Sequence, residues 1–222
     1  MLHFDNCILN NPDREGGWKQ MKQEQKQEPL LWVPDTDKEV LNKMFQNKLD
    51  RSYQRPSHLD ILAQQAIVIS KRSTCLFYEV GAAIFSGDIM LSSGYNGAAR
   101  GDVDPRIAGC ARVVDGKIQE GQGLCRGSHA ELNAIGNLTS STVGLEDLRM
   151  VVTLHPCFSC AKQIVNKKIK KVYYVWEYGR EQGVTQYLID RGVEVEKYSS
   201  VFLQRWIERN GYDPVGLRHQ EL

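Results

Sequence analysis

Two short segments constrain this chain more than any other part of its 222 residues. The first reads SHAE at residues 128–131, and the second reads PCFSC at residues 156–160. Zinc takes nitrogen and thiolate ligands in tetrahedral geometry, and a catalytic zinc site keeps its fourth position open for water. One histidine and the two cysteines of a CxxC motif supply three ligands. The pattern therefore predicts a catalytic zinc site held by His129, Cys157 and Cys160.

Each segment also has a second interpretation. Ser128 and Glu131 precede an apolar stretch and fit a helix capping box, in which Glu131 would only bond the backbone. Cys157 and Cys160 could form a redox dithiol, or half of a four-thiolate structural zinc site. The two segments occur together in the order HxE and then PCxxC, which resembles the zinc-binding pattern of nucleobase deaminases. This resemblance implies that Glu131 is the acid–base residue of a zinc enzyme.

Composition narrows the classes of partner. Lys plus Arg number 28 and Asp plus Glu number 27, so the bulk charge does not indicate a nucleic-acid partner. The apolar runs are too short to cross a membrane, and residues 1–10 lack the basic start and apolar core of a secretory signal. We therefore expect a cytoplasmic protein with no membrane partner, in which the six cysteines are reduced.

The chain divides into three parts by composition. Residues 1–57 form an N-terminal extension of unassigned role, which is partly irregular and has a short helix opened by the capping-box pattern at 36–39. Residues 58–198 form the expected catalytic domain, and residues 199–222 a C-terminal helix and tail.

Strands and helices alternate along the expected catalytic domain. Apolar residues repeat at helical spacing from Leu59 to Ile67, and residues 97–126 form a long loop rich in Gly, Asp and Arg. This alternation predicts a layered α/β domain. The other expected elements are a hairpin at 80–85 and 89–95 with a turn at 86–88, strands at 150–154, 171–176 and 193–196, and helices from 128, from 157 to about 166 and from 181 to 190.

Residues 58 to about 198 resemble a deoxycytidylate (dCMP) deaminase of the zinc-dependent cytidine deaminase superfamily. HAE and PCxxC mark the superfamily, whereas GYNG at 94–97 and the extension HAELNAI at 129–135 resemble the dCMP branch. Further matching segments are KRSTC at 71–75, VGA at 80–82, CRG at 125–127 and TLHPC at 153–157. The resemblance implies a three-layer αβα fold with a central mixed five-stranded sheet.

The resemblance also implies a reaction, the hydrolytic deamination of dCMP to dUMP and ammonia, which supplies dUMP for thymidylate synthesis. Zinc would lower the pKa of bound water from about 16 toward 7. Glu131 would take the proton from this water and pass it to N3 and then to the leaving 4-amino group, as hydroxide attacks C4 of the cytosine ring.

Substrate contacts follow from the same resemblance. Asn96 would bond the sugar hydroxyl, while Ala130 and Asn133 would shape the pocket. A turn residue between glycines is the other interpretation of Asn96. Tyr178 and Arg180 would close on the substrate or its phosphate, although a solvent-exposed loop explains these two residues equally well.

Three further cysteines, Cys75, Cys110 and Cys125, are the hypothetical ligands of a second, structural zinc. The alternative is that they are buried free cysteines, which are common. Relatives usually assemble through this domain, so we expect a homo-oligomer, with a hexamer as the expected form.

Regulation by dCTP and dTTP, with Mg²⁺ accompanying the nucleotide, occurs in many relatives through a loop that reads GYNGxPxG. Here Ala99 replaces the proline. The same loop could instead serve subunit contacts. The candidate effector residues are Gly94, Gly97, Arg100 and Gly101.

Rival functions remain. The HAE and PCxxC motifs do not read the phosphate count, so dCTP, alone or with dCMP, is the nearest alternative substrate. A tRNA adenosine or single-stranded DNA deaminase would need a basic or aromatic surface. A non-catalytic zinc-binding regulatory protein would not need Glu131, the one residue of the pattern that is not required to hold zinc.

Overall fold

The computed structural model describes residues 55–119, 125–138, 147–179 and 181–214. The short helix predicted near residues 36–39, Arg180, and the end of the tail at 215–222 lie outside the described residues.

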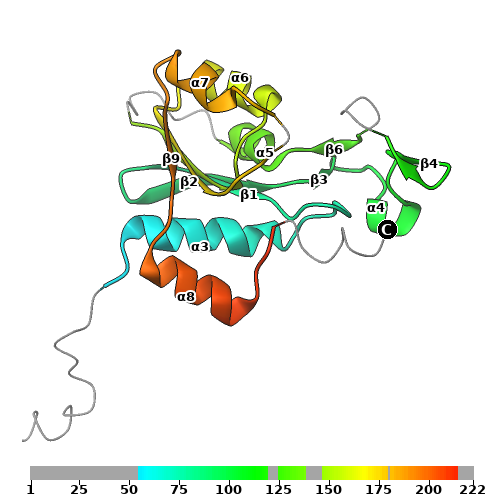
Figure 1. Ribbon diagram of the computed structural model, residues 1–222, viewed down its shortest axis with the longest axis horizontal. Helices are drawn as coiled ribbons and strands as arrows, with labels where there is room; N and C mark the ends of the chain where they lie inside the picture. The colour runs from blue at the N-terminus through cyan, green and yellow to red at the C-terminus, as the bar shows by residue number, and fades with distance from the viewer. Residues whose placement is uncertain (1–54, 120–124, 139–146, 180, 215–222) are drawn as a thin grey trace, which may run out of the picture. The chain divides into compact units, whose positions relative to one another are not determined.

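A mixed five-stranded sheet forms the centre of the described part of the chain (Figure 1), with the strand order β2-β1-β7-β8-β9. Strand β1 runs antiparallel to both β2 and β7, whereas β7, β8 and β9 run parallel to one another. The predicted sheet is therefore confirmed. The strands are β1 (Gly81–Ser86), β2 (Ile89–Tyr95), β7 (Arg149–Leu154), β8 (Lys171–Trp176) and β9 (Glu194–Lys197).

The hairpin of β1 and β2 follows the predicted pattern. Its connection consists of Gly87 and Asp88, and Gly87 has a φ of 54°, a left-handed conformation that suits glycine. Strand β2 ends at Tyr95, and the N–H of the following residue, Asn96, donates a hydrogen bond to the carbonyl of Val80, which immediately precedes β1.

Helices cover both faces of the sheet (Figure 1). Helices α3 (His58–Ser70) and α8 (Val201–Asn210) lie on one face, and α5 (Ala130–Asn137), α6 (Phe158–Asn166) and α7 (Val184–Ile189) lie on the other. The three-layer αβα arrangement is thus confirmed. Helix α7 is shorter than the predicted 181–190, because Gly183 has a φ of 82° and marks the helix start.

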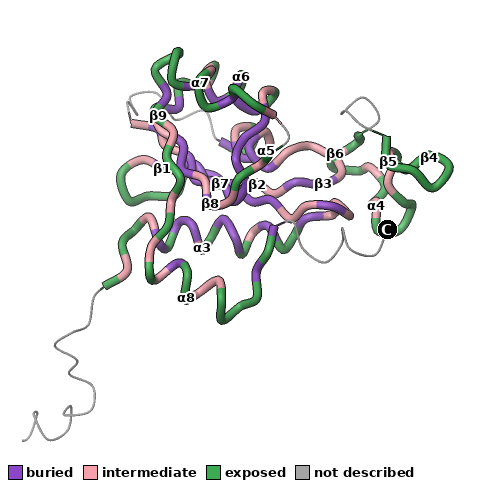
Figure 2. The backbone as a smooth tube through the Cα atoms, in the orientation of Figure 1, coloured by how far each residue is buried: buried purple, intermediate pink, exposed green. Residues whose placement is uncertain are grey.

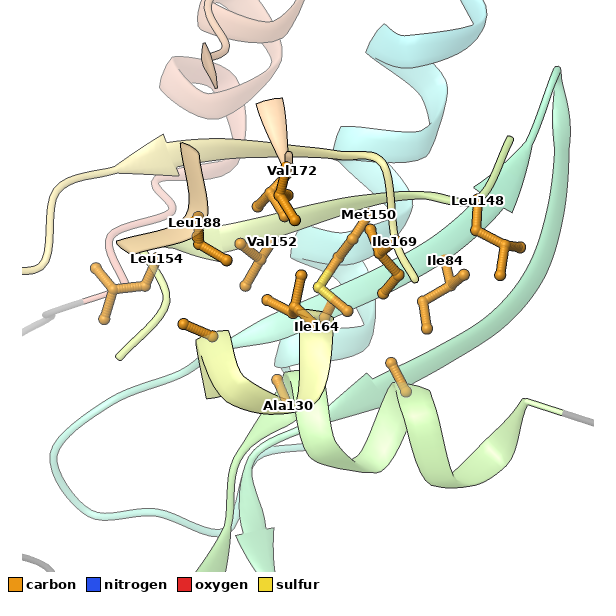
Figure 3. Packing of buried hydrophobic residues seen from close by; sticks show 14 of the residues in the cluster. Ile84, Ala130, Leu148, Met150, Val152, Leu154, Ile164, Ile169, Val172 and Leu188 are labelled. Atoms are coloured by element: carbon orange, nitrogen blue, oxygen red, sulfur yellow. The ribbon is translucent and has the colours of Figure 1, made fainter. Parts of the chain in front are cut away.

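Alternate residues of each strand serve the two core layers, because successive side chains of a strand point to opposite faces. In β1, Ala82 and Ile84 pack toward α5 and α6, whereas Ala83 and Phe85 pack toward α3. The purple segments of Figure 2 follow the central strands and the inner sides of the helices. Figure 3 shows the first layer, with side chains of Met150, Val152, Ile164, Leu154 and Ala130 gathered between the sheet and helices α5 and α6.

The long segment predicted as a loop at 97–126 holds several short elements. Strand β3 pairs with β6 across this segment, and the short helix α4 and strands β4 and β5 carry no buried residues. Elements of two residues leave too little periodicity for a sequence pattern to reveal them. The elements are β3 (Gly97–Ala98), α4 (Pro105–Ala108), β4 (Val113–Val114), β5 (Lys117–Ile118) and β6 (Gly127–Ser128).

No helix within the described ranges is both long enough and apolar enough to span a bilayer.

Candidate active site

The three predicted metal ligands sit at the starts of two helices. His129 is the residue that immediately precedes α5, and Cys157 immediately precedes α6, both with extended backbone conformations. Cys160 lies in the first turn of α6, three residues after Cys157, so the two sulfur atoms face the same side of the helix. Strand β7 ends at Leu154, and the short connection that follows it delivers Cys157 to the site.

The ligand atoms of these residues converge. The Nδ1 atom of His129 lies 3.4 Å from Sγ of Cys157 and 3.3 Å from Sγ of Cys160. All three ligand atoms lie within 4.8 Å of one another, and both cysteines are buried. One imidazole nitrogen and two sulfurs at such separations form a donor set that fits zinc. The predicted zinc triad is therefore brought together by the fold.

Negative charge is favoured on one of the two sulfurs. Hydrogen bonds from Cys160, together with His129, lower the pKa of the Cys157 thiol to about 3 despite its burial. The hydrogen bond with Cys157, then burial, raises the pKa of Cys160, and the Cys157 hydrogen bond raises the pKa of His129. The cluster thus holds a thiolate ready to bind a cation, since metal binding requires deprotonated ligands.

Glu131 lies beside this cluster in the first turn of α5, with only 4% of its surface exposed. Burial is the main cause that raises the pKa of its carboxyl group, and the neighbouring His129 acts in the opposite direction. A carboxyl group with a raised pKa can both hold and release a proton nearer to neutral pH.

The capping-box interpretation of Ser128 and Glu131 is wrong. Helix α5 begins after His129, which is its N-cap residue. The side chain of His129 makes no capping hydrogen bond. Ser128 lies instead in β6, paired with Gly97 of β3. Its backbone belongs to this ladder, so Glu131 does not act as the partner of a capping serine.

A cavity of about 900 Å³ opens over the cluster. His129, Glu131 and Cys157 line it, so two of the three predicted metal ligands share this space with Glu131. Cavities that bind small molecules commonly span roughly 300–1,000 Å³. This cavity can therefore hold a nucleotide-sized ligand.

Asn96 also lines the cavity and is buried. Its Oδ1 atom accepts a hydrogen bond of 2.8 Å from the backbone N–H of Val80, and its Nδ2 atom donates one of 3.0 Å to the carbonyl of Tyr78. One amide hydrogen and one lone pair remain for a ligand. The turn interpretation and the sugar-binding prediction are thus compatible, because the same side chain fixes the 78–80 segment.

The other predicted substrate residues differ in position. Ala130 and Tyr178 line the cavity, and the Tyr178 ring meets the Tyr78 ring edge-on, with centroids 6.0 Å apart. Asn133 is not among the described residues that line it. Its Nδ2 atom donates a hydrogen bond of 2.7 Å to the Tyr95 carbonyl, so it supports the loop that carries Asn96.

The predicted effector loop has mixed structural roles. A Cβ atom at Gly94 would lie 2.3 Å from the backbone nitrogen of Ala134, so this glycine permits close packing of β2 against α5. A Cβ atom at Gly97 would lie 2.4 Å from Oγ1 of Thr74. Arg100 is exposed, and Gly101 has a φ of 83°. Effector binding by this loop stays a prediction.

Cys75, Cys110 and Cys125 line the same cavity as His129, Glu131 and Cys157. Among the described residues, however, the set of three potential ligands whose atoms come together is His129, Cys157 and Cys160. The second zinc site therefore stays a prediction.

Two cavity residues carry chemistry that the sequence interpretation did not assign. The ring of His155 is held at Nδ1 by the Pro156 carbonyl, 3.0 Å away, and at Nε2 by the Thr185 hydroxyl, 2.9 Å away. Glu181 also lines the cavity. His155 lies within the TLHPC segment, and Glu181 directly follows Arg180. In the sequence, their closeness to these predicted site residues was the one signal that they line the cavity.

Residues 56–176 match the family model described as the cytidine and deoxycytidylate deaminase zinc-binding region. ComE operon protein 2 of Bacillus subtilis strain 168 is 33% identical over 133 residues, which cover 60% of this chain and 67% of that protein. The deoxycytidylate deaminase of Schizosaccharomyces pombe is 30% identical over 146 residues, which cover 65% of this chain but only 45% of the yeast protein.

A solved structure has a similar fold. The crystal structure of dCMP deaminase from the cyanophage S-TIM5, in complex with dCMP and dUMP, matches with a TM-score of 0.54 and 29% sequence identity. The match covers 66% of this chain and 100% of the phage chain. The resemblance therefore extends from sequence motifs to the arrangement of the fold.

Proposed function

Because the chain belongs to the family of the cytidine and deoxycytidylate deaminase zinc-binding region, we propose that it catalyses the zinc-dependent hydrolytic deamination of dCMP to dUMP and ammonia. One observation carries the proposal: the buried Glu131 lines the same cavity as His129 and Cys157, whose ligand atoms converge with that of Cys160. The names of the yeast relative and of the cyanophage structure support dCMP as the substrate. The product dUMP would supply thymidylate synthesis.

His129, Cys157 and Cys160 would hold the zinc ion. When bound by three protein ligands, zinc supplies a water molecule activated for attack at neutral pH. Glu131 would accept a proton from this water and deliver protons to N3 and to the departing amino group of cytosine. The C4–N bond breaks as a C4–O bond forms, so cytosine and water give uracil and ammonia.

Burial suits Glu131 to this task. Removal from water raises the pKa of its carboxyl group, so that the protonated form is available for donation to the leaving nitrogen. The position of Glu131 in the first turn of α5, two residues after His129, fixes the carboxyl group relative to the metal ligands. One side chain can then serve successive proton transfers.

The rest of the cavity would position the nucleotide. Asn96 would use its remaining amide hydrogen and lone pair for the sugar hydroxyl, and Ala130 would line the space next to the base. Asn133 would act indirectly, through its hydrogen bond to the Tyr95 carbonyl. Tyr178 and Arg180 would meet the phosphate end of the substrate.

We extend the proposal to a cytoplasmic homo-oligomer, with the hexamer as the expected form, and to control by dCTP and dTTP with Mg²⁺. The exposed Arg100 and Gly101 would offer a cation and a backbone nitrogen for phosphates, and the buried Gly94 and Gly97 would shape the loop. Cys75, Cys110 and Cys125 would provide ligands for a second, structural zinc. Metal analysis of the pure protein tests this last point, since a ratio near one zinc per chain would remove it.

A second candidate substrate is dCTP. The HAE and PCxxC motifs do not distinguish one phosphate from three, and the cavity of about 900 Å³ lies within the range of small-molecule sites, so either nucleotide is a candidate.

Ammonia release from cytidine, dCMP, dCTP and a cytosine-containing single strand tests the proposal. Each substrate is assayed with and without added effector nucleotide. We expect dCMP to be turned over fastest. Activity confined to dCTP or to the single strand would keep the reaction and replace the substrate, and zinc binding without any turnover would favour a regulatory zinc protein.

A further inference from the structure

Glu181 makes one hydrogen bond that connects it to the metal-binding helix. Its Oε2 atom accepts a hydrogen bond of 2.6 Å from the backbone N–H of Phe158, although the two residues are far apart in the chain. Phe158 is the first residue of α6 and directly follows Cys157. Glu181 belongs to the connection between β8 and α7, is half-buried and lines the cavity.

Helix α6 needs such an external partner. The first backbone N–H groups of any helix have no acceptor within the helix. Phe158 is the first residue of α6, so its N–H is one of these groups, and Glu181 supplies the acceptor. A side chain from outside the helix can satisfy such a group in this way.

Phe158 is held by its side chain as well. Its ring meets the ring of Tyr187 in α7 edge-on, with centroids 5.6 Å apart and an interplanar angle of 76°. Glu181 therefore fixes the backbone of Phe158 while Tyr187 fixes its ring. Glu181 and Tyr187 both belong to region 181–187, so this region contacts the first residue of α6 at two points.

We propose that Glu181 is a positioning residue that fixes the start of α6 and thereby holds the sulfur atoms of Cys157 and Cys160 in register with His129. Cys157 directly precedes Phe158, and Cys160 follows it by two residues, so a displacement of Phe158 moves both sulfurs. The inference rests on the proposed zinc site. Residues that orient metal ligands typically change metal affinity or activity by roughly 10–100-fold when substituted.

The hydrogen bond and the negative charge of Glu181 can be separated. Glu181→Gln keeps an oxygen that can accept from the Phe158 N–H but removes the charge. Glu181→Ala removes both, and Glu181→Asp keeps the charge on a side chain shortened by one methylene group. Glu177→Ala is the matched control, because Glu177 is an exposed carboxylate of the same region that bonds Tyr174 and Lys197 instead of α6.

Zinc affinity measured by competition with a chromophoric chelator is the first readout, and the absorption spectrum of the Co²⁺-substituted protein is the second. We expect Glu181→Ala and Glu181→Asp to weaken zinc binding by about tenfold and to alter the cobalt spectrum. Glu181→Gln and Glu177→Ala are expected to keep the wild-type affinity and spectrum. A general loss of stability would not explain wild-type zinc affinity in Glu181→Gln together with weakened affinity in Glu181→Ala and Glu181→Asp.

The outcomes separate this inference from the proposed function. A wild-type protein that fails to bind zinc would contradict the proposed function. Zinc-binding wild type with unchanged Glu181→Ala and Glu181→Asp variants would overturn the positioning role alone. If Glu181→Gln loses as much affinity as Glu181→Ala, charge rather than the hydrogen bond matters, and the inference is wrong. Should the alanine variant fail to fold, the glutamine and aspartate variants still decide.

Discussion

The hydroxyl group of Tyr212 donates a hydrogen bond of 2.7 Å to the carbonyl oxygen of Glu79. The carbonyl of Pro214 accepts a second bond, 3.1 Å long, from the N–H of the same glutamate. Glu79 lies between Tyr78 and Val80, both of which line the cavity. The segment that follows α8 therefore supports the 78–80 segment of the cavity wall through the backbone of Glu79. This supporting segment lies outside the 56–176 family match.

Tyr212→Phe should weaken this support. The substitution keeps the ring, which packs edge-on against Trp176, but removes the donor to Glu79. The Ser70 hydroxyl, which also contacts Tyr212, keeps the Ile67 carbonyl as an acceptor 2.7 Å away. Loss of a partner for buried polar groups costs about 1–3 kcal/mol. We expect chemical denaturation to show a loss of this size and steady-state kinetics to show a higher KM for dCMP. Unchanged stability together with unchanged KM would argue against the supporting role.

Gly94→Ala should displace helix α5. The added Cβ atom would lie 2.3 Å from the Ala134 nitrogen and 2.4 Å from the Ala130 carbonyl oxygen, both backbone atoms that cannot rotate away. We expect a loss of about 1–3 kcal/mol or more and a large drop in turnover, because α5 carries Glu131.

The control for this substitution is Gly136→Ala, in the same helix. A Cβ atom there meets nothing within 4 Å, so alanine should leave turnover intact and stabilise the protein by about 0.4–1 kcal/mol. Equal effects of the two variants would show that the close packing at Gly94 is unimportant.

Asn96→Ala should affect both folding and substrate binding. It would leave the buried N–H of Val80 without its acceptor, at a cost of about 1–3 kcal/mol. Asn137→Ala is the comparison, since the exposed Asn137 also bonds a backbone carbonyl, that of Ser93, but lies away from the cavity. Denaturation and KM measurements distinguish the two. An Asn96 variant that matches the Asn137 variant in both would count against its place in the site.

Asp60 should make stability depend on pH. Burial acts to raise the pKa of its carboxyl group, but hydrogen bonds from Ser200, Ser57 and Tyr198 outweigh burial, so the pKa is lowered. Because the pKa of Asp60 is lower in the folded state, ionised Asp60 stabilises the fold. This stabilisation is complete above the unfolded-state pKa of about 3.9 and is lost as the pH falls through the folded-state pKa.

Asp60→Asn tests this dependence. The free energy of unfolding of the wild type should exceed that of the variant by about 1–3 kcal/mol near neutral pH, and the gap should narrow below about pH 4. A gap that widens as the pH falls would show that the sign is wrong.

Local pattern was sufficient for some features and insufficient for others. Strand β8 runs over the predicted residues 171–176, because valine and aromatic residues, which favour strands, follow one another without interruption from 172 to 176. The metal triad was also predictable, because its ligands lie in two compact motifs. The contact of Asn133 with Tyr95 and the pairing of Gly97 with Ser128 join segments that are distant in the sequence. No local sequence pattern indicates either contact. The link from Glu181 to Phe158 is of the same kind.

The most direct test of the central claim compares dCMP deamination by the wild type and by Glu131→Gln at equal, measured zinc content. Glutamine preserves the size of the buried side chain but cannot carry the proton. We predict that the variant folds and binds zinc like the wild type, while its rate of ammonia release falls by about 10²- to 10⁴-fold. A zinc-loaded Glu131→Gln protein that deaminates dCMP at the wild-type rate would contradict the account.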